Sequence, residues 1–548
     1  MMQNFRFLIL FLAAYILISP EISAQKEFNR ADSLKGGLTM ERIWWDLKYY
    51  HLQTEVRPEA KYISGSNTIH YEVLNPQQVM QIDLQKPMRI DSIIQNGMQL
   101  EFTTEFDAHF IQLKEEQKAG AINKLTVYYS GNPTVAKNAP WDGGFTWEKD
   151  DQGQDFIATA NQGIGASVWW PCKDQPADEP DSMLISVNVP KPLVDISNGR
   201  LREVEDLKNS RTYHWFVSNP INNYGVNLNI GDYVNFTEKY EGEKGVLDCS
   251  YWVLSYNLEK AKKQFQEVPR MLEAFEHWFG PYPFYEDSYK LVQAPYLGME
   301  HQSSVTYGNG FKNGYRGRDL SQTGWGLKFD FIIIHESGHE WFANNITYKD
   351  VADMWIHESF THYSENLFLD YHYDSLAANA YVQGVRSSIQ NDRPIIGEYG
   401  VSHEGSGDMY YKGGNMLHMI RQLFDNDEKW RQTLRGLNKE FYHQTVTTSQ
   451  IENYISESFG KPLSKVFDQY LRTTQIPTFT YRVLGNQLLY KWENSVDGFE
   501  MPIKIFINGE AEWLKPNSRS YKSLQNLPEN AEIFVDPNFY VADFNLTE

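Results

Sequence analysis

The chain has 548 residues, of which 41% are hydrophobic and 15% aromatic, enough for several packed domains and unlike the composition of a disordered protein. Its formal net charge of −21 argues against nucleic-acid binding, because a phosphate backbone requires a basic face. The two cysteines, Cys172 and Cys249, could form one bridge but are too few for a disulfide framework.

The first residues have the pattern of an export signal. Arg6 lies in a short polar start, an apolar run follows over 7–18, and small residues suitable for cleavage end at Ala24. We therefore expect residues 1–24 to be a signal peptide and the mature protein to be exported, periplasmic or secreted, without stable membrane insertion. An uncleaved anchor is the alternative, although the run is short for a membrane span of about 20 residues.

Residues 25–253 are expected to form an N-terminal β domain. Short alternating apolar segments, interrupted by turn residues, follow one another in this region. The clearest of them are 47–56, 63–74, 79–84, 110–113 and 125–129. Such regular short strands indicate an all-β domain, to which both cysteines would belong.

Near residue 254 the apolar period changes from two to three and four, which predicts a second domain over 254–476. An apolar helical stripe there contains Pro269, which is expected to kink the helix. Residues 289–293 are expected to form a strand that carries Gly298, Met299 and Glu300 to its edge.

Further helices are predicted over 413–424, 429–441 and 461–471. One more is expected to begin at Ser449, because the S-x-x-E sequence ending at Glu452 has the form of a capping box. Alternation then returns, so residues 477–548 are expected to form a small β-sandwich. The predicted fold class is multidomain α+β.

The segment 335–339, H-E-S-G-H, lies between apolar residues at helical spacing. His335 and His339 are four residues apart, so they share one helix face and can reach a single ion. Glu336, beside that face, can take a proton from an activated water. Because such a pentad arises by chance with odds of roughly a few in a hundred, a third ligand has to support the assignment.

Glu358 is the expected third ligand, since a catalytic zinc takes three protein ligands. It stands within W-I-H-E-S-F, at the predicted start of another helix. His335, His339 and Glu358 form the gluzincin arrangement, and this donor set favours one Zn²⁺ per chain. Glu365 could orient a ligand histidine from behind, or it could be an ordinary glutamate on the helix surface.

Together these motifs resemble the zinc aminopeptidases of the aminopeptidase N family, in a three-domain form without the helical C-terminal domain of many relatives. Three further segments support the resemblance: L-G-M-E-H at 297–301 for G-x-M-E-N, Y-Y-K-G at 410–413 for Y-x-K-G, and W-P-C-K-D-Q-P at 170–176 for F-P-C-x-D-x-P. The resemblance implies a saddle-shaped N-terminal β domain, a thermolysin-like catalytic domain, and a buried free thiol at Cys172.

The resemblance also implies catalytic and binding roles. Glu336 would be the general base, and the phenol of Tyr410 would stabilise the oxyanion. The residues implied to hold the substrate around its free α-ammonium are Glu300, Gln162, Gly298 and Met299. Leu297 and His301 depart from the family motif, and His301 could change how the amine is held or add pH dependence near neutrality.

The expected function is zinc-dependent removal of the N-terminal residue from peptides that have a free N-terminus. A zinc endopeptidase or an epoxide hydrolase on the same fold is the competing enzymatic hypothesis, and a non-catalytic peptide-binding protein is the other alternative. Glu300 argues against a pure endopeptidase, because an exopeptidase needs an anion for the substrate's ammonium. The complete set of ligands with Glu336 and Tyr410 argues against loss of catalysis.

Overall fold

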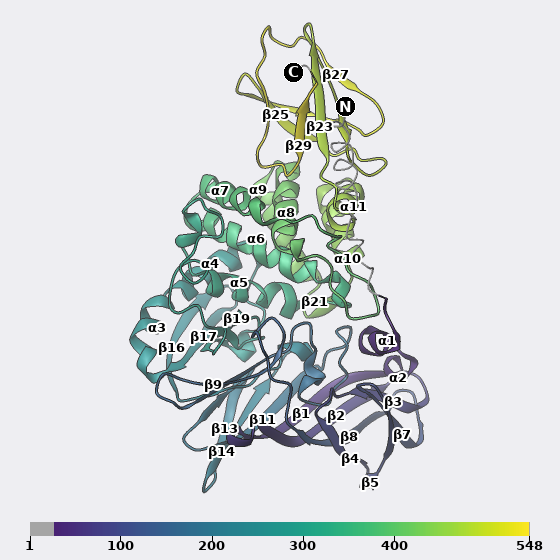
Figure 1. Cartoon of the computed structure of the whole chain (residues 1–548), viewed down its shortest axis with the longest axis vertical. Coiled ribbons are helices and arrows are strands. Elements are labelled where there is room, and N and C mark those ends of the chain that lie inside the picture. Colours follow the sequence, from purple (N-terminus) through teal and green to yellow (C-terminus); the bar gives the residue numbers. More distant parts are fainter. Residues whose placement is uncertain (1–26, 547–548) are drawn as a thin grey trace, which may run out of the picture.

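The structure is a computed structural model that describes residues 27–546. The expected signal peptide, residues 1–24, lies outside the described residues. The molecule is elongated, with the N-terminal sheets at one end, helices in the middle and the small C-terminal sheets at the other end (Figure 1). The multidomain α+β class expected from the sequence is confirmed.

Three sheets form the N-terminal β domain, with the strand orders β13-β14-β11-β1-β2-β8-β4-β5, β3-β7-β6 and β12-β15-β10-β9. The strands are β1 (Trp45–Arg57), β2 (Tyr62–Val73), β3 (Gln77–Asp83), β4 (Arg89–Gln95), β5 (Met98–Gln99), β6 (Glu101–Glu105), β7 (Ala108–Gln117), β8 (Ile122–Gly131), β9 (Gly144–Lys149), β10 (Asp155–Ala160), β11 (Ser182–Pro190), β12 (Val194–Ile196), β13 (Arg200–Asp206), β14 (Ser210–Val217) and β15 (Asn229–Gly231). Alternate side chains along β1 and β2 are buried, since successive side chains point to opposite faces. The three sheets share one core.

A five-stranded sheet in the order β16-β17-β18-β20-β19 begins the second unit. Its strands are β16 (Tyr233–Gly242), β17 (Gly245–Leu254), β18 (Tyr289–Gln293), β19 (Gly298–Met299) and β20 (Val305–Tyr307). β18 coincides with the strand expected at 289–293, and β19 carries Gly298 and Met299 at the sheet edge, so this prediction is confirmed.

The expected domain boundary at residue 253 lies too late in the chain. β17 pairs in parallel with β18, and four of its buried side chains, including that of Cys249, belong to the core of the second unit. Strands β16 and β17 therefore belong to the five-stranded sheet of the second unit, and Cys249 does not lie in the N-terminal domain as expected. Cys172 lies in the other core, and both cysteines are buried free thiols.

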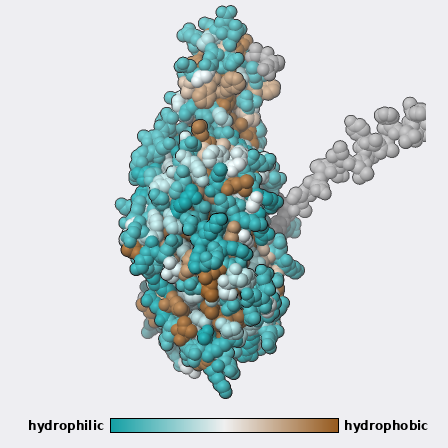
Figure 2. Space-filling view, turned by 90° about the vertical axis from the view of Figure 1, so that its left-hand side faces the viewer, coloured by the Kyte–Doolittle hydropathy of each residue, from teal (hydrophilic) through white to brown (hydrophobic). Residues whose placement is uncertain are grey.

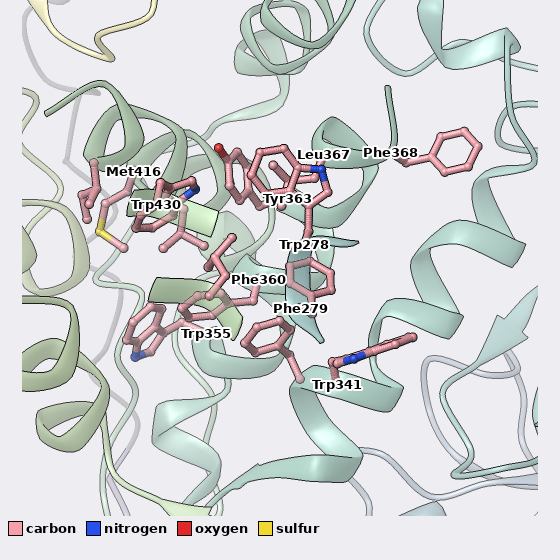
Figure 3. Close-up of a cluster of buried hydrophobic side chains, with 14 of the residues drawn as sticks. Trp278, Phe279, Trp341, Trp355, Phe360, Tyr363, Leu367, Phe368, Met416 and Trp430 are labelled. Atoms are coloured by element: carbon pink, nitrogen blue, oxygen red, sulfur yellow. The ribbon is translucent and has the colours of Figure 1, made fainter. Parts of the chain in front are cut away.

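The helices of the second unit pack on this sheet and on each other (Figure 1). They are α3 (Leu258–Gln264), α4 (Glu267–Phe279), α5 (Phe331–Gly338), α6 (Trp355–His372), α7 (Ser375–Gly384), α8 (Tyr411–Phe424), α9 (Asp427–Glu440), α10 (Thr448–Phe459) and α11 (Ser464–Arg472). Every residue of α6 from Trp355 to Leu369 is buried. Figure 3 shows its side chains packed among those of neighbouring helices, namely Trp278 of α4, Met416 of α8 and Trp430 of α9.

Two helix boundaries differ from the sequence expectation. Instead of a kink at Pro269, the helix is interrupted at residues 265–266, because the proline ring clashes with the carbonyl of the residue four positions before it. The capping box of α10 uses Thr447 and Gln450, whose side chain accepts from the Thr447 amide at 3.0 Å. The expected box at Ser449 is therefore wrong by two residues.

The C-terminal residues form two small sheets in the orders β27-β24-β23-β29 and β26-β25-β28. The strands are β23 (Thr478–Leu484), β24 (Gln487–Glu493), β25 (Ile503–Ile507), β26 (Glu510–Leu514), β27 (Lys522–Leu524), β28 (Ile533–Val535) and β29 (Ala542–Asn545). Phe479 and Trp492 of one sheet and Ile505 of the other lie in the same core as residues of α11. The C-terminal sheets are thus packed onto the helical part of the molecule.

The face shown in Figure 2 is mostly hydrophilic, with apolar side chains in separate small groups. Within residues 27–546, the structure contains no helix with the length and apolar character of a membrane span.

Candidate metal centre

Helices α5 and α6 bring three metal-donor residues together. His335 lies on α5 and His339 caps its C-terminus one turn later, with ring centroids 5.1 Å apart, and Glu358 lies in the first turn of α6. Glu358 Oε2 is 3.7 Å from His335 Nε2 and 3.4 Å from His339 Nε2. This buried oxygen has no hydrogen-bond partner among the described residues. Three donor atoms therefore converge on one point.

The donor set fits Zn²⁺. Two imidazole nitrogens and one carboxylate oxygen are the ligands of many catalytic zinc sites. Burial opposes ionisation of Glu358, but the neighbouring His339 and His335 hold its pKa well below the usual range. The carboxylate is thus in the ionised form that binds a metal.

The far side of each histidine is occupied by a hydrogen-bond acceptor. His335 Nδ1 lies 2.8 Å from Glu365 Oε1, and His339 Nδ1 lies 3.1 Å from the carbonyl oxygen of Phe342. A proton on Nδ1 leaves the Nε2 lone pair free toward Glu358. Glu365 is fully buried, so the alternative of a helix-surface glutamate is wrong.

The Phe342 carbonyl reaches His339 because the helix ends at this point. α5 stops at Gly338, and the segment Glu340–Asn345 continues as a wider π-helical turn. Within it, Phe342 leaves the helical conformation, with φ −125° and ψ 83°. A regular helix would have kept this carbonyl in its own hydrogen-bond ladder.

Glu336 lies beside the convergence point and against β19. A Cβ atom at position 298 would lie 2.8 Å from Glu336 Oε1 and 2.7 Å from Ile332 Cγ2, so Gly298 is the residue that allows this approach. Burial raises the pKa of Glu336 to about 7, while the charge of His335 acts in the opposite direction. A carboxylate with a pKa near neutrality can both accept and return a proton.

An overlapping group, formed by Glu300, Glu336 and His339, also has donor atoms within 4.8 Å of one another. The group of His335, His339 and Glu358 suits a metal better, because its histidines have their second nitrogens engaged and the Glu358 oxygen is otherwise unpartnered.

Gln162 connects the N-terminal domain to this centre. Its Nε2 donates to Glu300 Oε1 at 2.7 Å and to Glu358 Oε1 at 2.9 Å. Glu300 is 2% exposed, and burial raises the pKa of its carboxyl. The backbone carbonyl of Glu300 accepts from Asn344 Nδ2 at 2.9 Å, which fixes the end of the strand. The structure thus places Glu300 and Gln162 directly beside the metal donors.

Tyr410 lies at the N-terminus of α8 and lines the same cavity as the metal donors. Its ring stacks against that of His335, with centroids 6.1 Å apart. Burial, with the negative charges of Glu358 and Glu300, raises the pKa of Tyr410 well above its usual value. The phenol therefore stays protonated and can donate a hydrogen bond.

The metal donors, together with Glu336, Glu300, Gln162 and Tyr410, line a cavity of about 500 Å³, a size typical of sites for small ligands. Apolar side chains from separate loops complete its walls, among them Trp141, Tyr315, Leu320 and Met409. Arg393 also lines the cavity. No motif in the sequence singled out these five residues, because they come from segments that only the fold brings together.

His301 does not have the role considered for it. It is fully buried, is absent from the described cavity wall, and has its Nδ1 3.4 Å from Thr306 Oγ1. Burial lowers the pKa of His301 to about 3. The expectation that this residue adds pH dependence near neutrality is therefore wrong.

Known proteins resemble the chain in sequence and in fold. "Probable aminopeptidase 2" of Sulfurisphaera tokodaii is 22% identical over 65% of this chain and 47% of its own length. "Leucyl aminopeptidase" of Saccharolobus solfataricus is 24% identical, with 76% and 53% covered, and "Aminopeptidase N" of Lactobacillus helveticus is 24% identical, with 78% and 51% covered. The chain spans about half the length of the curated relatives it matches.

The crystal structure of the M1 zinc metallopeptidase from Deinococcus radiodurans aligns with a TM-score of 0.68 and 21% identity, covering 80% of this chain and 96% of that chain. This likeness establishes the fold. Residues 47–224 match the peptidase M1 N-terminal domain and residues 263–470 match the peptidase family M1 domain, which together account for most of the chain. The chain belongs to peptidase family M1.

Proposed function

We propose that the protein is a zinc-dependent aminopeptidase that removes the N-terminal residue from peptides with a free α-ammonium group. One observation carries the proposal: the converging, buried donors of His335, His339 and Glu358 share a cavity with the carboxylate of Glu300. A metal site alone supports many hydrolases. An anion fixed next to it selects substrates whose positively charged end lies beside the reacting bond.

His335, His339 and Glu358 would hold the ion. Zn²⁺ bound there supplies a Lewis acid that polarises a carbonyl and lowers the pKa of water from about 15.7 to near 7. Glu336 accepts the proton of the attacking water and passes it to the leaving amine, a task suited to its pKa of about 7.

The phenol of Tyr410 donates to the oxyanion that develops at the scissile carbonyl. One donor of this kind contributes about 3 to 4 kcal/mol to lowering the barrier. Its raised pKa keeps the proton on the phenol at neutral pH, and Tyr410 lines the same cavity as Glu336.

Glu300 binds the α-ammonium of the substrate, and Gln162 holds the Glu300 carboxylate by the 2.7 Å hydrogen bond. Because Gln162 also binds Glu358, it fixes the distance between the ammonium site and the metal donors. This arrangement disfavours an endopeptidase, whose substrate has no charge at that point.

The test is hydrolysis of a panel of aminoacyl-anilides and their N-acetylated counterparts by the zinc-loaded protein. We expect cleavage of free amines alone, with loss of activity in Glu336→Ala and a strong rise of KM in Glu300→Ala. Equal cleavage of the acetylated substrates would contradict the proposed aminopeptidase function and favour an endopeptidase. Absence of turnover in a protein that carries one zinc per chain would favour a peptide-binding role.

We also propose that the protein acts outside the cytoplasm, on the strength of the export pattern in residues 1–24. N-terminal sequencing of the protein recovered from the producing cells should begin near Gln25. Recovery of the uncleaved chain from the cytoplasm would contradict this proposal.

A further inference from the structure

The wall of the cavity has an unusual charge distribution. Four glutamates line it, namely Glu300, Glu336, Glu358 and Glu404, whereas Arg393 is the single arginine or lysine on it within the described part of the chain. Three of the glutamates surround the point where the substrate's ammonium and the metal would sit. With Zn²⁺ held by its three donors, Arg393 is the one positively charged side chain of the described wall outside the metal centre, and so the place there that attracts an anionic group.

Backbone hydrogen bonds fix the chain on both sides of Arg393. It lies in the segment between η9 (Val385–Ser388) and η10 (Gly407–Met409). Before it, the amides of Gln390 and Asn391 donate to the buried carboxylate of Asp408 at 2.8 and 2.6 Å. After it, the amide of Ile395 donates to the carbonyl of Leu471 at 3.0 Å. The position of Arg393 is therefore fixed before any ligand binds.

The two arms of this segment approach closely at Gly405. A Cβ atom there would lie 1.9 Å from the carbonyl oxygen of Ile395, so the contact requires glycine. The Gly405 carbonyl in turn accepts from Arg393 Nη2 at 3.0 Å. This bond orients the guanidinium along the cavity wall.

The guanidinium of Arg393 has N–H groups available to bind a ligand. Within the described residues, its one carboxylate neighbour inside 4 Å is Asp392, at 3.9 Å from Nη1. Asp392 is itself bonded to the hydroxyl of Ser406. A planar guanidinium with free N–H groups is suited to a carboxylate, which it can bind through two parallel hydrogen bonds.

We propose that Arg393 binds the C-terminal carboxylate of short peptides, so that the enzyme prefers substrates of a few residues whose two ends are held by Glu300 and Arg393. The inference rests on the proposed aminopeptidase function. A cavity of about 500 Å³ matches a short peptide, and a peptide's two terminal charges are opposite to those of the two side chains. A carboxylate on an acidic side chain offers the same chemistry, and the test below separates the two sources.

The experiment compares an apolar tripeptide that has a free C-terminus with the same tripeptide as its C-terminal amide. For the wild type we expect kcat/KM to be about tenfold higher for the free acid, a value kept modest because the Arg393 side chain is 54% exposed. The ratio should fall to near one in Arg393→Ala and be intermediate in Arg393→Lys. Arg519→Ala, an exposed arginine of the C-terminal sheets, should keep the wild-type ratio.

Calorimetric titration of the Glu336→Gln protein with both peptides gives the same comparison without turnover. A ratio near one in the wild type, or an unchanged ratio in Arg393→Ala, would overturn the inference while anilide hydrolysis continued. A tripeptide amide with Glu as its third residue should be cleaved no faster than the apolar amide. If it were cleaved as well as the free acid, the carboxylate source would be a side chain and the assignment to the C-terminus would be wrong. Loss of all hydrolysis in the wild type would instead reject the proposed function.

Discussion

The two ends of the cavity are built in different ways. The metal end comes from α5 and α6, whose donor side chains are buried and have their second nitrogens or oxygens bonded. The substrate end comes from the end of β19 and from loops of two domains, and some of its side chains are open: Trp141 is 58% exposed, whereas Glu300 is buried. Rigid helices fix the reacting groups, whereas hydrogen bonds between distant loops set which peptide can reach them.

The largest effect should come from Glu336→Gln, which removes the base and keeps the shape. We expect kcat on an aminoacyl-anilide to fall on the order of 10³-fold, because the amide cannot accept the proton of the water. Zinc content, measured by mass spectrometry of metals, should remain near one per chain, since Glu336 is not one of the three converging donors. Loss of zinc would favour the overlapping group that includes Glu300 and Glu336.

Glu365→Gln tests the hydrogen bond between Glu365 and the metal-donor residue His335. The substitution weakens the acceptor for His335 Nδ1, and we expect zinc affinity to fall by about 10- to 100-fold, measured by competition with a chelator. Glu457→Gln, an exposed position on α10, is the matched control and should bind zinc as the wild type does. Equal affinity in the two variants would show that Glu365 does not tune the site.

Gly298→Ala tests the position where the metal end and the substrate end of the cavity meet, because Gly298 lies against Glu336. The added Cβ would lie 2.8 Å from Glu336 Oε1, so the base must move by a few tenths of an ångström. We expect kcat to fall about tenfold while zinc affinity stays the same, because geometry at the reacting atoms controls the rate. Gly407→Ala, where a Cβ would meet nothing within 4 Å, is the control for a glycine on the same cavity wall. A drop in zinc binding with Gly298→Ala would mean that the strand supports the ligands themselves.

The metal end could be predicted from the sequence because it depends on helical spacing. A separation of four positions between His335 and His339, and of seven between Glu358 and Glu365, places the paired side chains on common helix faces whatever surrounds them. The substrate end depends on contacts between positions far apart: Gln162 bonds Glu300 and Glu358, which are 138 and 196 residues away. No local pattern encodes such a contact, and the place of Gln162 came from the family resemblance.

The predicted domain boundary at residue 253 was wrong for a related reason. β16 and β17 alternate with the same period as the N-terminal strands, so periodicity alone assigns them to the same domain. The strand that joins them to the second unit is β18, which follows β17 after two helices and pairs with it in parallel. His301 shows the opposite error, since a residue inside a functional motif turned out to be a buried core residue.

Gln162→Ala should have a smaller effect than the substitutions at Glu336, Glu365 and Gly298. It removes the two hydrogen bonds that join the N-terminal domain to Glu300 and Glu358, and we expect KM for a free-amine anilide to rise about fivefold, equivalent to roughly 1 kcal/mol. Gln85→Ala serves as the control: unlike Gln162, its amide bonds within the N-terminal domain, to the Ile164 carbonyl at 2.7 Å. If Gln162→Ala changed zinc affinity rather than KM, its bond to Glu358 would matter more than its bond to Glu300. The N-terminal domain would then act on the metal end, and the division of the cavity into a helical reacting end and a loop-built selective end would have to be redrawn.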